Sequence, residues 1–366
     1  MLESRTKNVG IIGAGYISKA YLNSRFPQFK ILCCGDLIPE NAELRAREFG
    51  IHARSVESIL ADPYLDVILN LTIPQSHVTV SLAAIEAGKH VYSEKPIALS
   101  REEARPLLEA TAAKGLRIGC APDTFLGGAH QTARKLVDDG AIGKPIGGSA
   151  FFMNSGPESW HPGPEFFYRK GAGPVFDMGP YYITALVNLL GPVKRVVSLG
   201  KNTRPKRVIG SGPREGTEFD AEVLTFVAAI LEFKSGPLVT FISSFDVVGH
   251  GHPPIEIYGT EGTLQVPDPN YFGGTVRVIR KGGRWTDVAH SHSFGDANHR
   301  GIGLADLAAS VVSGADHRAS GTLAFHVLEV LQAIIEIADG NHAFELNSTC
   351  ERPRPLVPIT AIADFS

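Results

Sequence analysis

The sequence predicts an α/β protein of two domains, the first built on a doubly wound parallel sheet and the second on an antiparallel or mixed sheet. The chain has 366 residues, which exceeds the roughly 250–300 residues that one hydrophobic core usually holds. Up to residue 122, short apolar segments alternate with helical patterns. Beyond that point, strand patterns follow one another with few helices between them, which indicates a change of sheet type.

The first five predicted strands are short and almost entirely apolar. They cover residues 8–12, 29–34, 66–71, 90–93 and 116–120. Helical patterns separate them: Pro39 starts one helix that Gly50 ends, and Ser100 with Glu103 forms a capping box at another. Apolar strands joined by helices belong to a parallel sheet buried on both faces, so residues 1–122 are predicted to form a doubly wound domain.

The second part of the chain, residues 123–345, is predicted to form the other α/β domain. Its strand patterns cover residues 145–153, 193–199, 222–233, 237–245, 254–259, 262–266 and 275–280. Helices are expected at 130–138, 302–313 and 323–337. Strands separated only by turns pair in an antiparallel way, as at Gly-Thr-Glu-Gly over 259–262. Residues 346–366, which contain three prolines, are expected to form an extended tail.

Composition excludes several classes of function. The 35 Lys and Arg against 38 Asp and Glu give a net charge of -3, with no basic excess to hold nucleic acid or an anionic membrane. The longest apolar stretches fall far short of the roughly 20 residues that span a bilayer. The first residues show no signal-peptide pattern, so we expect a cytoplasmic protein.

Cysteines and histidines give no sign of a disulfide framework or a metal site. The four cysteines include no Cys-x-x-Cys, and we expect buried thiols. Two histidine pairs, His250 with His252 and His290 with His292, lack a third ligand at helical spacing. No metal is therefore predicted.

A dinucleotide site is predicted directly after the first strand. Gly13-x-Gly15-x-x-Ser18 stands at a strand-to-helix junction, and the helix is expected to reach about Arg25. Gly13 permits the tight turn, and Gly15 lets the backbone approach a pyrophosphate at the helix N-terminus. Tyr16 and Ile17 belong to the same turn and are predicted to contact the cofactor.

Asp36 ends the second strand about 20 residues after the glycine turn, where a carboxylate accepts the ribose hydroxyls of adenosine. It would repel a 2′-phosphate, and Leu37 supplies no cation to hold one. The sequence therefore favours NAD as the cofactor over NADP.

Further polar residues follow the third and fourth of these strands. Thr72, Pro74 and His77 follow residues 66–71, at the sheet edge where the nicotinamide half of the cofactor is expected. Glu94 and Lys95 follow residues 90–93 at the same edge. A Lys beside a positively charged nicotinamide ring should have a lowered pKa, which suits proton transfer.

Taken together, these motifs resemble the Gfo/Idh/MocA family of sugar and cyclitol oxidoreductases. The resemblance rests on the glycine turn, Leu-Ala-Asp-Pro at 60–63, Asp-Val-Ile-Leu-Asn-Leu-Thr-x-Pro at 66–74 and Ala-Gly-Lys-His-Val-Tyr-Ser-Glu-Lys-Pro at 87–96. It implies a Rossmann domain followed by an α/β domain with an open, mostly antiparallel sheet. In the family that sheet commonly forms the oligomer interface, which implies a homodimer or homotetramer here.

The resemblance also implies catalytic residues. The family's Lys of Glu-Lys-Pro corresponds to Lys95, and its Lys–Pro bond is often cis. The second family motif, Asp-x-Gly-x-His, reads Asp177-Met-Gly-Pro-Tyr181 here, so Tyr replaces His as in the glucose–fructose oxidoreductase branch. Asp177 and Tyr181 share one face if the segment is helical. Lys95, aided by the Tyr181 hydroxyl, is expected to take the substrate proton, and Asp177 to orient the substrate or tune Lys95.

Substrate contacts are expected from a loop and from a polar segment. Family loops around Asn154, Trp160, His161 and Tyr168 line a sugar pocket, and an aromatic ring beside polar groups suits a carbohydrate. His299 lies in a polar segment before a predicted helix and is the weaker candidate.

The sequence thus indicates an NAD-dependent dehydrogenase acting on a secondary alcohol of a sugar, sugar derivative or cyclitol. Two alternatives stay open. One is a sugar–sugar oxidoreductase that keeps its cofactor bound, as Tyr181 suggests; the other is a non-catalytic NAD-sensing regulator, against which the intact Glu94-Lys95-Pro96 argues.

Overall fold

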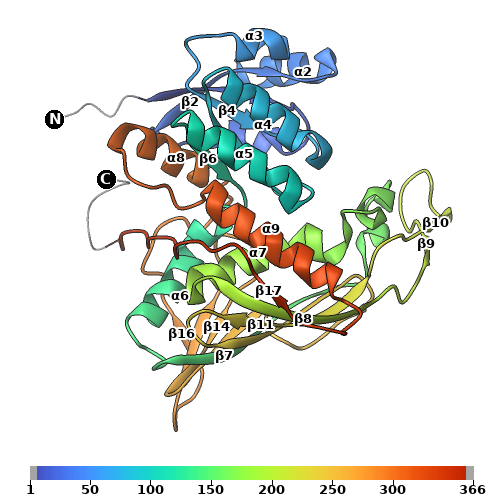
Figure 1. Ribbon diagram of the computed structural model, residues 1–366, viewed down its shortest axis with the longest axis vertical. Helices are drawn as coiled ribbons and strands as arrows, with labels where there is room; N and C mark the ends of the chain where they lie inside the picture. Colours follow the sequence, from blue (N-terminus) through green and yellow to red (C-terminus); the bar gives the residue numbers. More distant parts are fainter. Residues whose placement is uncertain (1–5, 360–366) are drawn as a thin grey trace. The chain divides into compact units, whose positions relative to one another are not determined.

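A computed structural model describes residues 6–359 (Figure 1). The chain divides into two compact units. The first comprises the chain up to Gly127, residues Asp296–Leu328 and the segment that begins at Leu356, and the second comprises Gly128–Gly295 and Glu329–Pro355. The continuous domain expected over 123–345 is therefore interrupted, because residues 296–328 return to the first unit.

Hydrogen bonds explain why residues 296–328 return to the first unit. The carboxylate Oδ2 of Asp123 accepts the N–H groups of Gly301 and Gly303 at 3.0 and 3.1 Å, at the start of helix α8 (Ile302–Ser313). The N–H of Cys120 donates to the carbonyl of Ala319 at 3.0 Å. Such contacts join residues 178 or more positions apart, which a reading of local patterns does not reveal.

The first unit is built on a six-stranded sheet with the order β3-β2-β1-β4-β5-β6, and every pairing in it is parallel. Its elements are β1 (Lys7–Ile12), α1 (Ser18–Leu22), β2 (Phe29–Gly35), α2 (Pro39–Phe49), β3 (His52–Ala53), α3 (Val56–Leu60), β4 (Val67–Asn70), α4 (His77–Glu86), β5 (His90–Ser93), α5 (Arg101–Ala113), β6 (Ile118–Cys120) and α8. The predicted doubly wound parallel sheet is confirmed.

Two elements of the first unit differ locally from the prediction. Helix α1 ends at Leu22 rather than near Arg25, and Asn23 already lies outside it. Strand β3 has only two residues, both exposed, so it carries no apolar pattern. The predicted caps are present: Gly50 ends α2 in a left-handed conformation, and the Ser100 hydroxyl accepts the N–H of Glu103 at 3.2 Å.

The second unit is built on a nine-stranded sheet with the order β16-β15-β14-β13-β7-β12-β11-β8-β17. Its elements are α6 (Gly128–Asp138), β7 (Pro145–Met153), α7 (Gly173–Leu190), β8 (Val193–Lys201), β11 (Phe226–Phe233), β12 (Leu238–Ser244), β13 (Ile255–Gly259), β14 (Gly262–Val266), β15 (Val276–Arg280), β16 (Thr286–Val288) and β17 (Phe344–Glu345), with β9 (Lys206–Val208) and β10 (Glu218–Asp220) pairing as a separate ribbon. Helix α9 (Gly321–Glu336) has residues in both units. Only β7 and β12 pair in parallel, so the mostly antiparallel sheet is confirmed.

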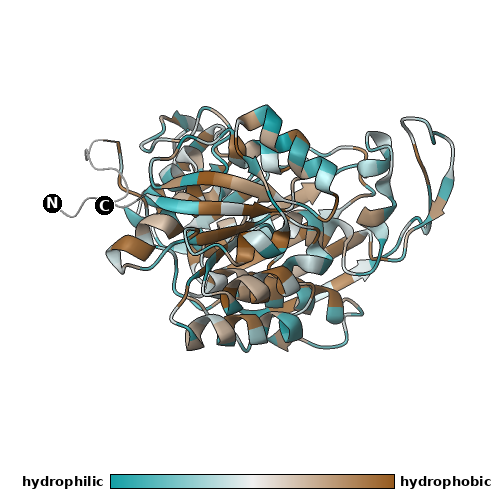
Figure 2. Cartoon of the chain, turned by 90° about the horizontal axis from the view of Figure 1, so that it is seen from above, coloured by the Kyte–Doolittle hydropathy of each residue, from teal (hydrophilic) through white to brown (hydrophobic). Residues whose placement is uncertain are grey.

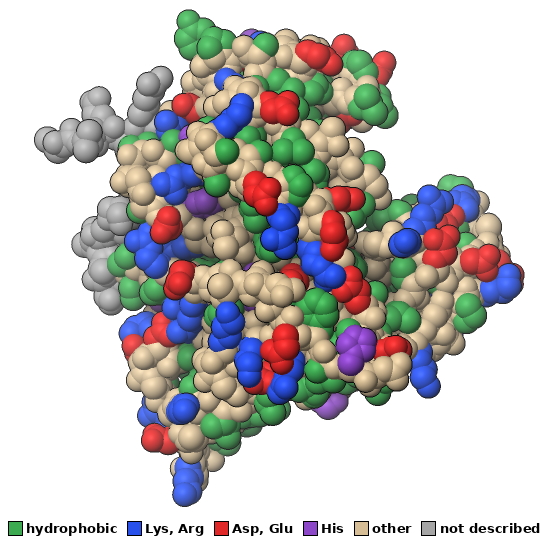
Figure 3. All heavy atoms as spheres, in the orientation of Figure 1, with side chains coloured by type: hydrophobic (Ala, Val, Ile, Leu, Met, Phe, Trp, Pro, Cys, Tyr) green, Lys and Arg blue, Asp and Glu red, His purple; other side chains and the backbone are tan. Residues whose placement is uncertain are grey.

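The nine-stranded sheet has one buried and one open face. Helix α7 packs on β7, β11 and β12, and α6 packs on β14 and β15. Along β11, and along β12 as far as Ser243, every second residue is buried and the residues between them are partly or fully exposed. Figure 2 shows hydrophilic and hydrophobic residues side by side along the helices, as expected where one side of a helix is buried. Figure 3 shows acidic and basic side chains interspersed over the visible face, without a large patch of one sign.

Candidate functional site

The glycine turn at the end of β1 has the geometry that a close approach of a ligand requires. Gly13 has φ +101°, and a Cβ there would lie 2.5 Å from the backbone of Leu71, so no other residue fits. Gly15 differs, because a Cβ built on it meets no atom within 4 Å. The backbone at Gly15 is therefore bare and open, as the approach of a pyrophosphate requires.

Ser18, the third position of the glycine motif, and Arg45 brace this turn, and the contribution of Arg45 was not predicted. The Ser18 hydroxyl donates to the carbonyl of Gly15 at 2.6 Å, and the Nε of Arg45, from α2, donates to that hydroxyl at 3.2 Å. Ser18 is completely buried. Its presence in place of Gly or Ala thus gives the turn an added hydrogen bond and still permits close packing.

Asp36 directly follows β2 and lies beside the glycine turn. Its Oδ2 accepts the N–H of Ala14 at 2.7 Å, and its Oδ1 accepts the N–H of Ile38 at 2.9 Å and the Nδ2 of Asn41 at 3.3 Å. The carboxylate is held in one orientation by three donors, two of them backbone groups. This position at the end of β2 fits the ribose contact expected of it.

Several large apolar side chains around this sheet edge are exposed. Tyr16 is 90% exposed, Leu37 95% and Ile73 64%. They follow strands β1, β2 and β4, respectively, and flank the glycine turn, Asp36 and Thr72. A group of exposed apolar side chains at one sheet edge is typical of a ligand surface, so the residues present fit a bound dinucleotide. Ile17 is partly buried in the same turn.

Thr72, Pro74 and His77 form the connection from β4 to α4. The Thr72 hydroxyl donates to Oδ1 of Asn70 at 2.7 Å, and Pro74 begins a short 3₁₀ turn. His77 is completely buried; its Nδ1 lies 2.6 Å from the carbonyl of Pro96 and its Nε2 lies 3.0 Å from that of Thr72. His77 therefore ties the end of β4 to the segment that carries Lys95.

Glu94, Lys95 and Pro96 follow β5 at the same edge. The Lys95–Pro96 bond is cis, as the family resemblance implied. Oε2 of Glu94 accepts the N–H of Lys95 at 3.2 Å. Burial raises the pKa of the Cys120 thiol well above its usual range; the charge of Glu94 adds to this rise and that of Lys95 opposes it. Lys95, which is partly exposed, thus has its charge close to the end of β6.

Asp177 and Tyr181 lie four residues apart on α7 in the second unit, so the helical segment that the prediction required is present. Asp177 is partly exposed, and Tyr181 is 6% exposed. The roles assigned to the two side chains stay predictions.

The loop of residues 154–168 presents one aromatic group and buries another. Trp160 is 63% exposed and packs edge-on against His161, whose ring also contacts Phe166 and Phe167. Oδ1 of Asn154 accepts the N–H of Gly156 at 2.9 Å, and Nδ1 of His161 accepts that of Gly163 at 3.0 Å.

Tyr168 does not lie in an open pocket. Its side chain is completely buried, its hydroxyl donates to Glu158, and the guanidinium of Arg207 lies 4.8 Å from its ring centre. Arg207, from β9, also pairs with Asp246. Tyr168 therefore anchors the loop, and this buried network was missed because its members come from distant segments.

His299 lies before α8 in the first unit. Its Nε2 is 2.8 Å from Oδ1 of Asp296, and this hydrogen bond lowers the pKa of the Asp296 carboxyl. The pair is local, and a substrate role for His299 stays a prediction.

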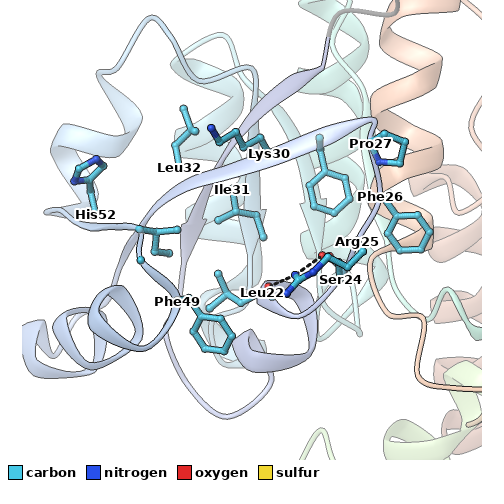
Figure 4. A pocket seen from close by; sticks show the side chains of 13 residues that line it. Leu22, Ser24, Arg25, Phe26, Pro27, Lys30, Ile31, Leu32, Phe49 and His52 are labelled. Atoms are coloured by element: carbon cyan, nitrogen blue, oxygen red, sulfur yellow. Dashed lines mark hydrogen bonds between the residues drawn. The ribbon is translucent and has the colours of Figure 1, made fainter.

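A pocket of about 680 Å³ opens elsewhere on the first unit (Figure 4). Its walls come from the end of α1 to the middle of β2 and from the end of α2, and the side chains drawn include Leu22, Phe26, Lys30 and Phe49. Arg25, which also lines it, donates to the carbonyls of Leu22 and Ser24. None of the predicted cofactor residues lines this pocket.

The described residues contain neither a metal-binding cluster nor a membrane-spanning helix. No group of three or more His, Cys, Asp or Glu residues between 6 and 359 is placed to hold a metal ion. Over the same range, no helix has both the length and the hydropathy of a membrane span. All four cysteines are free and buried, as expected.

Comparison with known proteins gives two family matches. Residues 7–121 match the family described as "Oxidoreductase family, NAD-binding Rossmann fold", and residues 130–265 match the "GFO/IDH/MocA C-terminal domain".

Levoglucosan dehydrogenase of Pseudarthrobacter phenanthrenivorans is 26% identical over 293 residues, 70% of this chain and 72% of the relative. The scyllo-inositol 2-dehydrogenase (NAD(+)) of Bacillus subtilis is 28% identical over 278 residues, 75% of each chain. The crystal structure of an NAD binding oxidoreductase from Klebsiella pneumoniae superposes with a TM-score of 0.82 at 20% identity, covering 93% of this chain and 99% of that one, which shows a shared fold.

Proposed function

The chain belongs to the GFO/IDH/MocA oxidoreductase family, and we propose that it is an NAD-dependent dehydrogenase that oxidises a secondary alcohol of a sugar, sugar derivative or cyclitol. The observation that carries the proposal lies within the first unit. Lys95 follows β5 at the sheet edge where β1 ends in the glycine turn and β2 ends in Asp36. The substrate class is supported by the names of the two relatives, which act on an anhydrosugar and on an inositol.

In this proposal, Lys95 is the acid–base catalyst. Bound NAD supplies the hydride acceptor for the alcohol carbon. The neutral amine of Lys95 takes the hydroxyl proton as the hydride leaves, and its ammonium returns the proton when a ketone is reduced. Tyr181 aids Lys95 in this proton transfer, and Asp177 orients the substrate or tunes Lys95. Further substrate contacts are proposed from Asn154, Trp160, His161 and His299.

The preference for NAD over NADP is proposed from Asp36. Its carboxylate is held in place by three donors, and its negative charge would repel a 2′-phosphate. Leu37, the next residue, is 95% exposed and brings no cation. A cytoplasmic location, where thiols stay reduced, fits the four free cysteines.

The test is NADH formation by the purified protein with a panel of anhydrosugars, inositols, aldoses and glycosides, offered with NAD and separately with NADP. With the best substrate, Lys95→Met should lower kcat by about a thousandfold or more while NAD still binds. Lys135→Met is the matched control, because the Lys135 side chain is 41% exposed and, among the described residues, forms an ion pair with Asp139 four residues on. Turnover that persists in Lys95→Met would refute the assignment.

Tyr181 supports a second candidate, an oxidoreductase that keeps its cofactor bound and passes the hydride between two sugars. NAD that copurifies and stays with the protein through gel filtration would favour this second candidate function. An NAD-sensing regulator would bind NAD yet show no turnover with any substrate of the panel.

We propose in addition that the chain forms a homodimer or homotetramer through the open face of the nine-stranded sheet. Val197 and Leu199 of β8 and Ile230 of β11 are exposed on this face at 40%, 63% and 39%. Val197 pairs directly with Ile230, so these side chains form a continuous apolar surface.

A further inference from the structure

A cluster of buried and partly buried polar side chains lies next to Lys95 in the first unit. Tyr21 comes from α1 and Tyr92 from β5, and Glu94 directly follows β5. The other two members are Asp123, which follows β6, and Arg300, which precedes α8. Tyr21, Tyr92 and Asp123 are completely buried, and Glu94 is 8% exposed. Neither the glycine turn nor the proposed substrate residues account for this cluster.

Tyr21 is the neutral hydrogen-bond donor of the cluster. Its hydroxyl donates to Oε1 of Glu94 at 2.8 Å. Burial raises the pKa of this hydroxyl well above its usual range, and the charge of Glu94 raises it further. The phenol thus keeps its proton and can act only as a donor toward the carboxylate. A buried carboxylate depends on such donors, because it has lost its hydration.

The two oxygens of Glu94 have different partners. Oε1 receives the Tyr21 hydroxyl, and the Nη1 of Arg300 lies 4.0 Å from it. Oε2 receives the backbone N–H of Lys95 at 3.2 Å. The hydrogen bond from Tyr21 therefore fixes the plane of the carboxylate, and with it the oxygen that holds the backbone of Lys95.

We propose that Tyr21 is a positioning residue for Lys95 and acts through Glu94. Without the Tyr21 hydroxyl, the carboxylate moves toward Arg300, and Oε2 leaves the N–H of Lys95. The Lys95 side chain then samples more positions than the productive one. Because proton transfer needs the amine within hydrogen-bond reach of the substrate hydroxyl, a small displacement lowers turnover. The catalytic consequence rests on the function proposed above, whereas the positioning itself does not.

Tyr92 provides a matched control in the same cluster. Its ring packs edge-on against that of Tyr21, with 6.5 Å between ring centres, and it is equally buried. Its hydroxyl has no hydrogen-bond partner among the described residues. Tyr92→Phe therefore removes a buried hydroxyl from the cluster without removing a donor to Glu94, and Tyr21→Phe removes the donor.

Two measurements on the full-length protein test the proposal. The first is the rate at which acetic anhydride acylates Lys95, relative to the exposed Lys135, followed by peptide mass spectrometry in wild type, Tyr21→Phe and Tyr92→Phe. This rate should rise about threefold in Tyr21→Phe and stay unchanged in Tyr92→Phe. The second is steady-state kinetics with NAD and the best panel substrate, where Tyr21→Phe should lower kcat about tenfold and leave the KM for NAD within about twofold.

The outcomes separate this proposal from the proposed function. An acylation rate in Tyr21→Phe equal to that of wild type overturns the positioning role, and so do equal changes in both Phe variants, since they indicate packing alone. A raised acylation rate in Tyr21→Phe alone, with turnover surviving in Lys95→Met, supports positioning and refutes the catalytic role of Lys95. Thermal unfolding midpoints of the two Phe variants that match wild type show that both fold.

Discussion

At the scale of single residues, the end of each strand in the first unit has a distinct task. Gly13 makes the turn that only glycine permits, and Gly15 leaves space above the backbone. Ser18 shows how a departure from the usual glycine pattern is accommodated, since its hydroxyl donates to Gly15 and accepts from Arg45. One small polar side chain thus replaces a packing glycine and stiffens the turn.

Asp36 carries the prediction on cofactor choice. Asp36→Asn removes the negative charge, and it also weakens the acceptor of the Ala14 N–H, which lies 2.7 Å from the carboxylate. Hydrogen bonds to a charged group contribute about 1.5–3 kcal/mol, so we expect the KM for NAD to rise about 10- to 100-fold. The preference for NAD over NADP, measured as the ratio of the two kcat/KM values, should fall in the same variant. Asp139→Asn, an exposed change in the second unit, should alter neither value, and an unchanged ratio in Asp36→Asn would contradict the selector role.

At the scale of elements, the predictable parts are those whose pattern is local. The strands 29–34 and 90–93 and the helix from Pro39 were predictable because apolar runs, caps and glycines mark them directly. The strand β3 and the ribbon of β9 and β10 were not, since they are short and mostly exposed. The candidate cofactor residues were predictable from their motif, whereas their supports, such as Arg45 and Tyr21, act across sequence distances that a motif does not contain.

Helix α6 contains a buried histidine with a consequence for stability. His130 is 1% exposed, its Nε2 lies 2.8 Å from the carbonyl of Tyr271, and burial lowers its pKa from 6.5 to about 4. The folded protein thus keeps His130 neutral at a pH where the unfolded chain takes up a proton. Its contribution is fully present above about pH 6.5 and is lost as the pH falls toward 4.

In His130→Gln, the free energy of unfolding should therefore fall less steeply as the pH is lowered from about 6.5 toward 4. A shift from 6.5 to about 4 corresponds to about 3 kcal/mol at the acid end, because each pKa unit is worth about 1.4 kcal/mol. Urea unfolding at several pH values between these limits measures this free energy, provided that the recorded signal reports on the second unit alone. His250→Gln, which changes an exposed histidine of the same unit, should leave the slope as in wild type. A slope in His130→Gln as steep as that of wild type would show that other groups cause the acid loss.

At the scale of the whole molecule, the two sheets differ in how they are covered. In the parallel sheet, the central strands β1 and β4 are buried on both faces, as shown by Val9, Ile11, Ile68 and Leu69, all 0% exposed. The nine-stranded sheet is covered by α6 and α7 on one face. Its other face carries apolar side chains in register across β8, β11 and β12. A one-sided sheet of this size needs either a polar outer face or a partner, and the residues present favour a partner.

Leu199→Asp tests whether that partner is a second copy of the chain. Leu199 is 63% exposed and pairs in register with Ala228 of β11, so a carboxylate there leaves the buried face untouched. Two such carboxylates brought into one symmetric interface would be desolvated and would repel each other, which disfavours association. We expect light scattering to find a dimer or tetramer in wild type and a smaller species in Leu199→Asp, with the same thermal unfolding onset when both are dilute. Tyr64→Asp is the control, because Tyr64 is 78% exposed in the first unit and its change should leave the mass unaltered. A monomeric wild type would mean that copies of the chain form no interface in solution. A Leu199→Asp variant of unchanged mass would mean that the interface lies elsewhere. In both cases the apolar face would need another occupant.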